Sequence, residues 1–210
     1  VRAMIRANVG CGNLEIMLPM IASVAEVDEA VRLINQAYFE LCQELNENIL
    51  KPKIGIMIEV PSAIFLMKEL ASKVDFFSVG SNDLTQYLLA VDRNNARVAH
   101  LYDAYHPSVI RALNEIAKQS QASLVPLSLC GELAGDAAGA VLLVAMGFDK
   151  LSMNPHNVGR IKWIIRHLSI AQAKNMLAHV LTLDNAKEIK NYLNEQLESI
   201  GLGGFVRAGM

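Results

Sequence analysis

The sequence lacks the features that mark membrane proteins, secreted proteins and nucleic-acid-binding proteins. It holds no apolar run of the roughly 18 residues that a membrane span needs, and no signal peptide opens it. It has no long basic run and a formal net charge of −2, which argues against nucleic acid and anionic membranes as partners. Its three cysteines form no CxxC pair and indicate a reducing compartment. We therefore expect a cytoplasmic protein.

What the sequence does contain is a large share of core-forming side chains. Of its 210 residues, 52% are hydrophobic and 19% are charged. This composition is typical of a folded globular chain rather than a disordered one. The length suggests one domain or a large piece of one, and the chain starts at Val1 as if it were cut from something longer.

Short apolar runs alternate with longer helical patterns, as in repeated βα units around a parallel sheet. We expect strands at residues 14–20, 54–60, 75–79, 124–129 and 151–153. A capping box formed by Ser23 and Glu26 predicts a helix after the first strand. Further helices are expected at residues 61–72, from about Asn82, from Pro107, and at residues 134–146, 157–167, 170–179 and 184–200, the last with Asp184 as its N-cap.

The number of predicted strands points to part of a barrel. A complete (β/α)₈ barrel has eight strands and roughly 250 residues. About five βα units followed by extra helices therefore predict an α/β fold that is the C-terminal portion of a TIM-type (β/α)₈ barrel. An open doubly wound sheet is the competing architecture, but no glycine-rich nucleotide-binding turn follows the first strand. The Gly10-Cys11-Gly12-Asn13 cluster precedes that strand and is interpreted as a plain turn.

Polar residues stand at the ends of four successive predicted strands, where parallel α/β folds bind their ligands. Glu59 lies inside an apolar run, and a buried carboxylate is costly unless it is paired or metal-bound. A structural ion pair is the plain alternative to a metal-ligand role. Asp83, one strand later, is a second carboxylate, and two carboxylates with substrate oxygens and water form a typical Mg²⁺ shell. Asn82 and Asp83 are alternatively the N-cap of a helix.

Three further features near these strand ends have both a functional and an ordinary interpretation. Residues 80–83 offer small side chains and free backbone N–H groups at a helix start, which suits a phosphate or carboxylate but is a weak signal alone. Arg93 is suited to bidentate anion binding, although an arginine after a helix is more often solvated. Cys130 stands between an apolar strand and Gly131, where a lone cysteine is usually a small core residue.

Three segments resemble signatures of the phosphoenolpyruvate-utilising enzymes. They are GIMIEVPSA at residues 55–63, FSVGSNDLTQY at residues 77–87 and LCGELAGD at residues 129–136, followed by the last strand at residues 151–153. Their order and spacing also fit, over essentially the whole chain. Within this family the chain resembles Enzyme I of the phosphotransferase system. The string Asp92-Arg93-Asn94-Asn95 and the ending at residues 201–207 resemble its nitrogen-regulatory form.

The resemblance implies a role for each candidate residue. Glu59 and Asp83 would hold Mg²⁺. Asn82, Asp83 and Arg93 would bind the substrate, with Asn82 and Arg93 at the phosphate of phosphoenolpyruvate. Cys130 would protonate the enolate at carbon three when pyruvate forms. The implied activity is transfer of phosphate from phosphoenolpyruvate to a histidine of the same protein and then to a carrier protein, in a homodimer.

The resemblance also shows what the chain lacks. Family members carry further substrate-binding arginines on earlier barrel strands, and a phosphorylated histidine in a Thr-Ser-His string of an upstream domain. Neither those strands nor that string is present in residues 1–210. We therefore expect a partial barrel domain that does not complete phosphotransfer by itself. The alternatives are a pyruvate phosphate dikinase or phosphoenolpyruvate synthase, a metal-dependent aldolase or lyase, and a regulatory dimerisation module with a silent site.

Overall fold

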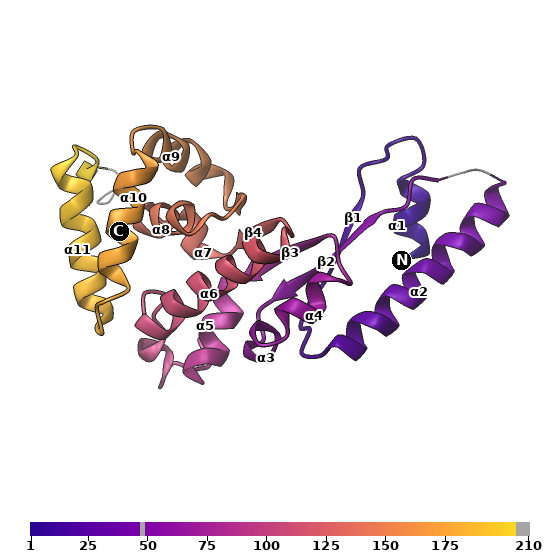
Figure 1. Cartoon of the computed structure of the whole chain (residues 1–210), viewed down its shortest axis with the longest axis horizontal. Coiled ribbons are helices and arrows are strands. Elements are labelled where there is room, and N and C mark those ends of the chain that lie inside the picture. Colours follow the sequence, from indigo (N-terminus) through magenta and orange to yellow (C-terminus); the bar gives the residue numbers. More distant parts are fainter. Residues whose placement is uncertain (47–48, 205–210) are drawn as a thin grey trace.

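The chain folds around one sheet of five parallel strands (Figure 1). The computed structural model describes residues 1–46 and 49–204. The strands lie side by side in the order in which they occur in the sequence. They are β1 (Glu15–Leu18), β2 (Lys53–Ile58), β3 (Phe76–Gly80), β4 (Leu127–Cys130) and β5 (Lys150–Ser152). Residues 205–207 of the ending that resembles the nitrogen-regulatory form lie outside the described residues.

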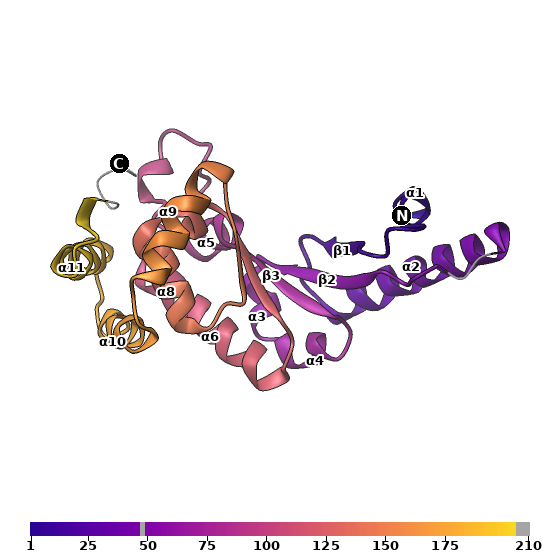
Figure 2. The same cartoon turned by 90° about the horizontal axis from the view of Figure 1, so that it is seen from above.

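Helices connect each strand to the next and follow one another along the sheet (Figure 2). The helices are α1 (Arg2–Ala7), α2 (Val24–Leu45), α3 (Pro61–Ile64), α4 (Met67–Ala71), α5 (Ser81–Leu89), the 3₁₀ helix η1 (Ala99–Leu101), α6 (Pro107–Ser123), α7 (Glu132–Gly135), α8 (Ala137–Met146), α9 (Pro155–Arg166), α10 (Ile170–Val180) and α11 (Ala186–Ser199). The predicted capping box is confirmed, because the Ser23 hydroxyl accepts from the Glu26 N–H and the Glu26 carboxylate accepts from the Ser23 N–H.

The strand order decides between the two predicted architectures. A doubly wound sheet reverses its strand order part-way and carries helices on both faces. Here the order is sequential, and the connecting helices pack on one another in turn, with α2 against α4, α4 against α6 and α6 against α8. This is the arrangement of consecutive units in a TIM-type barrel. The predicted α/β fold of about five such units with extra C-terminal helices is confirmed.

Two predicted helices are interrupted. The helix expected at residues 61–72 is divided into α3 and α4, because the backbone at Leu66 leaves the helical region, with φ −112° and ψ 7°. Asp136 is extended, with φ −89° and ψ 140°, so that a separate short helix, α7, precedes α8. Its carboxylate caps α8 by accepting a 2.8 Å hydrogen bond from the N–H of Gly139.

Other predicted boundaries are also wrong. The strand expected at residues 124–129 begins only at Leu127, since Leu124 adopts a left-handed conformation with φ 57° that ends α6. Asn185 caps the last helix, whereas the carboxylate of Asp184 accepts a 2.7 Å hydrogen bond from Arg111. The short helices α1 and η1 had no clear signal in the sequence.

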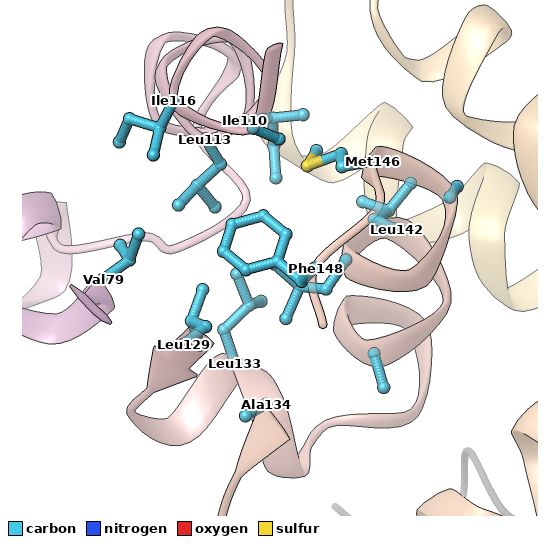
Figure 3. Close-up of a cluster of buried hydrophobic side chains, with 14 of the residues drawn as sticks. Val79, Ile110, Leu113, Ile116, Leu129, Leu133, Ala134, Leu142, Met146 and Phe148 are labelled. Atoms are coloured by element: carbon cyan, nitrogen blue, oxygen red, sulfur yellow. The ribbon is translucent and has the colours of Figure 1, made fainter. Parts of the chain in front are cut away.

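The face of the sheet that meets the helices forms the main core. Figure 3 shows Val79 of β3 and Leu129 of β4 directed toward Leu113 of α6 and Leu142 of α8, around Phe148. Full burial of such a side chain stabilises the fold by about 1.5–3 kcal/mol. The strand residues on this face are Ile56, Ile58, Phe77, Val79, Leu127 and Leu129.

Candidate active site

On the opposite face of the sheet, the carboxyl ends of β3 and β4 carry small and polar side chains. Side chains alternate between the two faces of a strand, so Ser78 and Gly80 of β3 lie on this face, as do Ser128 and Cys130 of β4. In a TIM-type barrel this face lines the interior, and its carboxyl end is where ligands bind. Gly80 and Cys130 are paired at that end of neighbouring strands.

Glu59 follows β2 at the same edge, and only 3% of it is exposed. Its Oε1 accepts a 2.7 Å hydrogen bond from the N–H of Met20, just after β1. Burial raises the pKa of the Glu59 carboxyl, the hydrogen bond from Met20 opposes this, and the charge of Asp83 raises the pKa further. Ionised Glu59 is therefore in an unfavourable environment unless a cation is close to it.

Asp83 and Arg93 form an ion pair near Glu59. Asp83 belongs to the first turn of α5, which starts directly after β3. One of its oxygens lies 3.6 Å from Nη2 of Arg93, and both side chains are 37% exposed. Such a half-exposed pair contributes little to stability, so the arginine is available to an anion. The backbone N–H of Arg93 also donates a 3.2 Å hydrogen bond to Oε1 of Gln86, which holds this loop against α5.

Two glycines permit the close approach of these groups. A Cβ placed on Gly80 would lie 2.6 Å from Oε2 of Glu59, so any other residue there would displace the carboxylate. Gly131 has a φ of 131°, and a Cβ there would lie 2.2 Å from the Ser81 hydroxyl oxygen. No pattern in the sequence predicts that these two glycines make room for Glu59 and Ser81.

Cys130 ends β4 and is half-buried on the polar side of the sheet. Its thiol donates to the carbonyl oxygen of Val79 at 3.5 Å and accepts from the Ser78 hydroxyl at 3.9 Å. The Ser81 hydroxyl donates to the Cys130 carbonyl oxygen at 3.2 Å, which joins the start of α5 to the end of β4. The thiol lies on the face of the sheet opposite the main core.

Asn82 and Asp83 do not cap α5. The N-cap is Gly80, and no side chain makes the capping hydrogen bond. Instead, Oδ1 of Asn82 accepts from the N–H of Glu132 at 3.4 Å and from the hydroxyl of Tyr102 at 3.4 Å. The Asn82 side chain therefore links the segment between α5 and α6 to the start of α7.

Two cavities meet at Asn82. The larger, of about 1020 Å³, is also lined by Cys130, and the smaller, of about 530 Å³, by Arg93. Tyr102 and Glu132 line both cavities. Neither residue was predicted for the site. Tyr102 lies between α5 and α6, about twenty positions after the end of β3. A search for polar residues at strand ends therefore does not find it.

The carboxylates of Glu59 and Asp83 fit a Mg²⁺ ion. Within residues 1–46 and 49–204 there is no group of three or more His, Cys, Asp or Glu side chains arranged for a metal. Mg²⁺, however, is usually held by one or two carboxylates together with water and substrate phosphate. The charge of Asp83 raises the pKa of the Glu59 carboxyl, and a cation between them would relieve that repulsion.

The fold and the site together define a TIM-type α/β protein with a polar, partly acidic ligand-binding edge. The family model described as "PEP-utilising enzyme, PEP-binding domain" matches residues 1–170. The chain therefore belongs to the family of phosphoenolpyruvate-utilising enzymes, as its three signature segments predicted.

Relatives of known name agree with this assignment. The chain is 48% identical over 210 residues to a protein of Escherichia coli (strain K12) named "Phosphoenolpyruvate-dependent phosphotransferase system", covering 100% of this chain and 28% of that protein. It is 42% identical over 199 residues to the "Phosphoenolpyruvate-protein phosphotransferase" of Haemophilus influenzae, covering 93% of this chain and 34% of that protein. The chain thus spans about a third or less of the length of these relatives.

Solved structures resemble the fold at low identity. A pyruvate kinase from Cryptosporidium parvum aligns with a TM-score of 0.55 and 14% identity, covering 91% of this chain and 38% of that one. A citrate lyase from Burkholderia xenovorans aligns with a TM-score of 0.51 and 16% identity, covering 91% of this chain and 67% of that one. At such identities the likeness concerns the fold alone. No helix in the described part of the chain is long and apolar enough to cross a membrane.

Proposed function

We propose that the chain is the phosphoenolpyruvate-binding part of a phosphoenolpyruvate-protein phosphotransferase. The longer protein transfers phosphate from phosphoenolpyruvate to one of its own histidines and then to a carrier protein, and releases pyruvate. The convergence of buried Glu59, the Asp83–Arg93 pair and Cys130 at one edge of the sheet is the observation that carries this proposal. The names of the relatives support the reaction class.

In this proposal the polar groups divide the substrate between them. Glu59 and Asp83 hold Mg²⁺, which when bound offsets negative charge on the enolate and phosphate oxygens. The guanidinium of Arg93 and the amide of Asn82 bind the phosphate, Arg93 through charge-assisted hydrogen bonds. Asn82 and Asp83 belong to the first turn of α5, and Arg93 lies in the loop after that helix. Because these groups are already in place, little reorganisation is needed when charge develops.

Cys130 has the role of the proton donor. When the bond between phosphorus and the enolate oxygen breaks, the phosphoryl group passes to the histidine nitrogen and the electron pair remains on the enolate. Carbon three of the enolate then takes the proton of the Cys130 thiol, which yields pyruvate and a thiolate. The thiolate regains a proton from water. In the structure the thiol donates a hydrogen bond to the carbonyl oxygen of Val79.

The rest of the proposed reaction depends on residues outside this chain. The phosphorylated histidine, the additional substrate-binding arginines and the contact with the carrier protein lie in upstream segments of the longer protein, which acts as a homodimer in the cytoplasm. The share of the relatives that the chain covers, 28% for the E. coli protein, leaves room for such segments.

Calorimetric titration with phosphoenolpyruvate tests the proposal. The full-length protein should bind it more tightly with Mg²⁺ than without, and residues 1–210 should bind it at least about tenfold more weakly, because hydrogen bonds to charged groups are missing. No Mg²⁺-dependent binding by the full-length protein would contradict the proposed function. Equal affinity in both forms would contradict the placement of essential ligands upstream.

A further inference from the structure

Tyr102 lies where the two cavities meet, with its phenol directed at Asn82. Its hydroxyl is 3.4 Å from Oδ1 of Asn82 and 3.5 Å from the Asn82 carbonyl oxygen. Both residues line the cavity that contains Cys130 and the cavity that contains Arg93. The phenol therefore stands beside the proposed phosphate-binding groups, although the reaction described above gives it no task.

The neighbours of Asn82 determine which way its amide is turned. The backbone N–H of Glu132 faces the same side-chain atom as the Tyr102 hydroxyl, at 3.4 Å. A backbone N–H is always a donor, whereas a side-chain amide offers one acceptor oxygen and one donor NH₂ group. The atom that faces Glu132 is therefore the oxygen. The NH₂ group of Asn82 is turned away from both donors and is available to an acceptor.

We infer that Tyr102 is a positioning residue, whose hydroxyl holds the Asn82 amide so that its NH₂ group donates to the phosphate of phosphoenolpyruvate. The inference rests on the proposed function, which assigns Asn82 to that phosphate. A rotated amide would present its oxygen to the phosphate oxygens, and two acceptors repel each other. Tyr102 thus acts on phosphate binding through Asn82.

Tyr102 is itself held in place by its neighbour in sequence. Asp103 accepts a 2.9 Å hydrogen bond from Lys190 of α11 and, through its other oxygen, a 2.9 Å hydrogen bond from the N–H of Tyr105. The loop that carries the phenol is therefore fixed to α11. A phenol of ordinary pKa, 10.0, already keeps its proton and remains a donor at neutral pH, and burial raises the pKa of Tyr102 further.

The test compares two substitutions that each remove one hydroxyl from the full-length protein. Tyr102→Phe should raise the dissociation constant of phosphoenolpyruvate with Mg²⁺ about three- to tenfold, the range for one hydrogen bond. It should leave the affinity for pyruvate, which lacks the phosphate, and the melting temperature unchanged. Tyr192→Phe, on α11 with its ring against His179, is the control and should change neither affinity. Unchanged phosphoenolpyruvate affinity in Tyr102→Phe, or equal weakening for pyruvate, would overturn the inference.

A double-mutant cycle with Asn82→Ala tests whether Tyr102 acts through Asn82. Once the amide is removed, Tyr102→Phe should cause no further loss of phosphoenolpyruvate affinity. An equal loss in both backgrounds would overturn the inference. If Asn82→Ala abolishes phosphoenolpyruvate binding, the effect of Tyr102→Phe on phosphoenolpyruvate affinity is compared with its effect on pyruvate affinity, and that comparison decides. A wild-type protein that does not bind phosphoenolpyruvate would overturn the proposed function and the inference with it. A wild type that binds while Tyr102→Phe binds equally well would overturn the inference alone.

Discussion

Leu129 and Cys130 are consecutive residues on opposite faces of the sheet, and they have different environments. Leu129 is completely buried in the main core, whereas Cys130 lies half-buried beside Ser78 at the ligand-binding edge. Because strand side chains alternate, one step along β4 leads from a position that maintains the fold to one proposed for chemistry. Alternate residues of β4 are therefore divided between the core and the proposed active site.

The separation has a cost on the polar face. Glu59 is buried there with a raised pKa, and Gly80 has no side chain with which to pack. Neither feature stabilises the folded protein. Groups that destabilise a fold are retained where activity needs them, and burial of the core-facing side chains offsets the lost stability. Substitutions on the two faces should therefore have opposite profiles, with activity affected on one and stability on the other.

The largest effect is expected for Cys130→Ala in the full-length protein. Removing a general acid typically slows the reaction about 10²–10⁴-fold, because the lost interaction is made mainly in the transition state. Phosphoenolpyruvate affinity should change little, since phosphate recognition is assigned to Asn82 and Arg93. Pyruvate production, substrate affinity and melting temperature should be measured together. Normal pyruvate production with a lowered melting temperature would show that Cys130 is an ordinary packing residue.

Leu129→Ala should show the opposite profile at the neighbouring position. Loss of a buried leucine side chain lowers the free energy of unfolding by about 2–5 kcal/mol. The rate per folded molecule should stay near that of the wild type. Urea unfolding measures the change, and Leu124→Ala is the matched control, because Leu124 is 90% exposed and surface substitutions usually stay within about 0.5 kcal/mol. A similar loss at both leucines would contradict the assignment of stability to the helix-facing side.

How far the sequence predicts this arrangement depends on the kind of signal. The ends of parallel strands meet at one edge, so the positions of Glu59, Asp83 and Cys130 followed once the strands were identified. The kink at Leu66 and the left-handed Leu124 carry no such signal, since leucine is an ordinary helix former and its side chain does not mark a break in a helix.

The contact between Tyr102 and Asn82 could not be predicted from the sequence either. It joins residues that are 20 positions apart through an irregular loop, and no periodic pattern places such a loop in space. The roles of all the candidate residues, Glu59, Asn82, Asp83, Arg93 and Cys130, stay predictions.

The smallest effect, and the one that tests the cost of the polar face directly, is expected for Glu59→Gln. The pKa of Glu59 is raised above its ordinary value of 4.5, so the folded state binds more protons than the unfolded state between the two pKa values. Stability therefore falls as pH rises through that interval and stays lower above it. Glutamine has no charge to bury, so Glu59→Gln should raise the melting temperature at neutral pH but leave it unchanged in acid, below 4.5.

Glu26→Gln is the control of opposite sign. Backbone hydrogen bonds from Ala22 and Ser23 lower the pKa of the exposed Glu26 carboxyl, so its contribution is present above the unfolded pKa and is lost as pH falls through the folded one. Glu26→Gln should thus lower the melting temperature at neutral pH. Adding Mg²⁺ and phosphoenolpyruvate should stabilise the wild type and Glu26→Gln but not Glu59→Gln, because a ligand stabilises only the form that binds it. If Glu59→Gln melted at a lower temperature than the wild type at neutral pH, the buried carboxylate would be a stabilising partner of Met20 and not a group held ready for a cation.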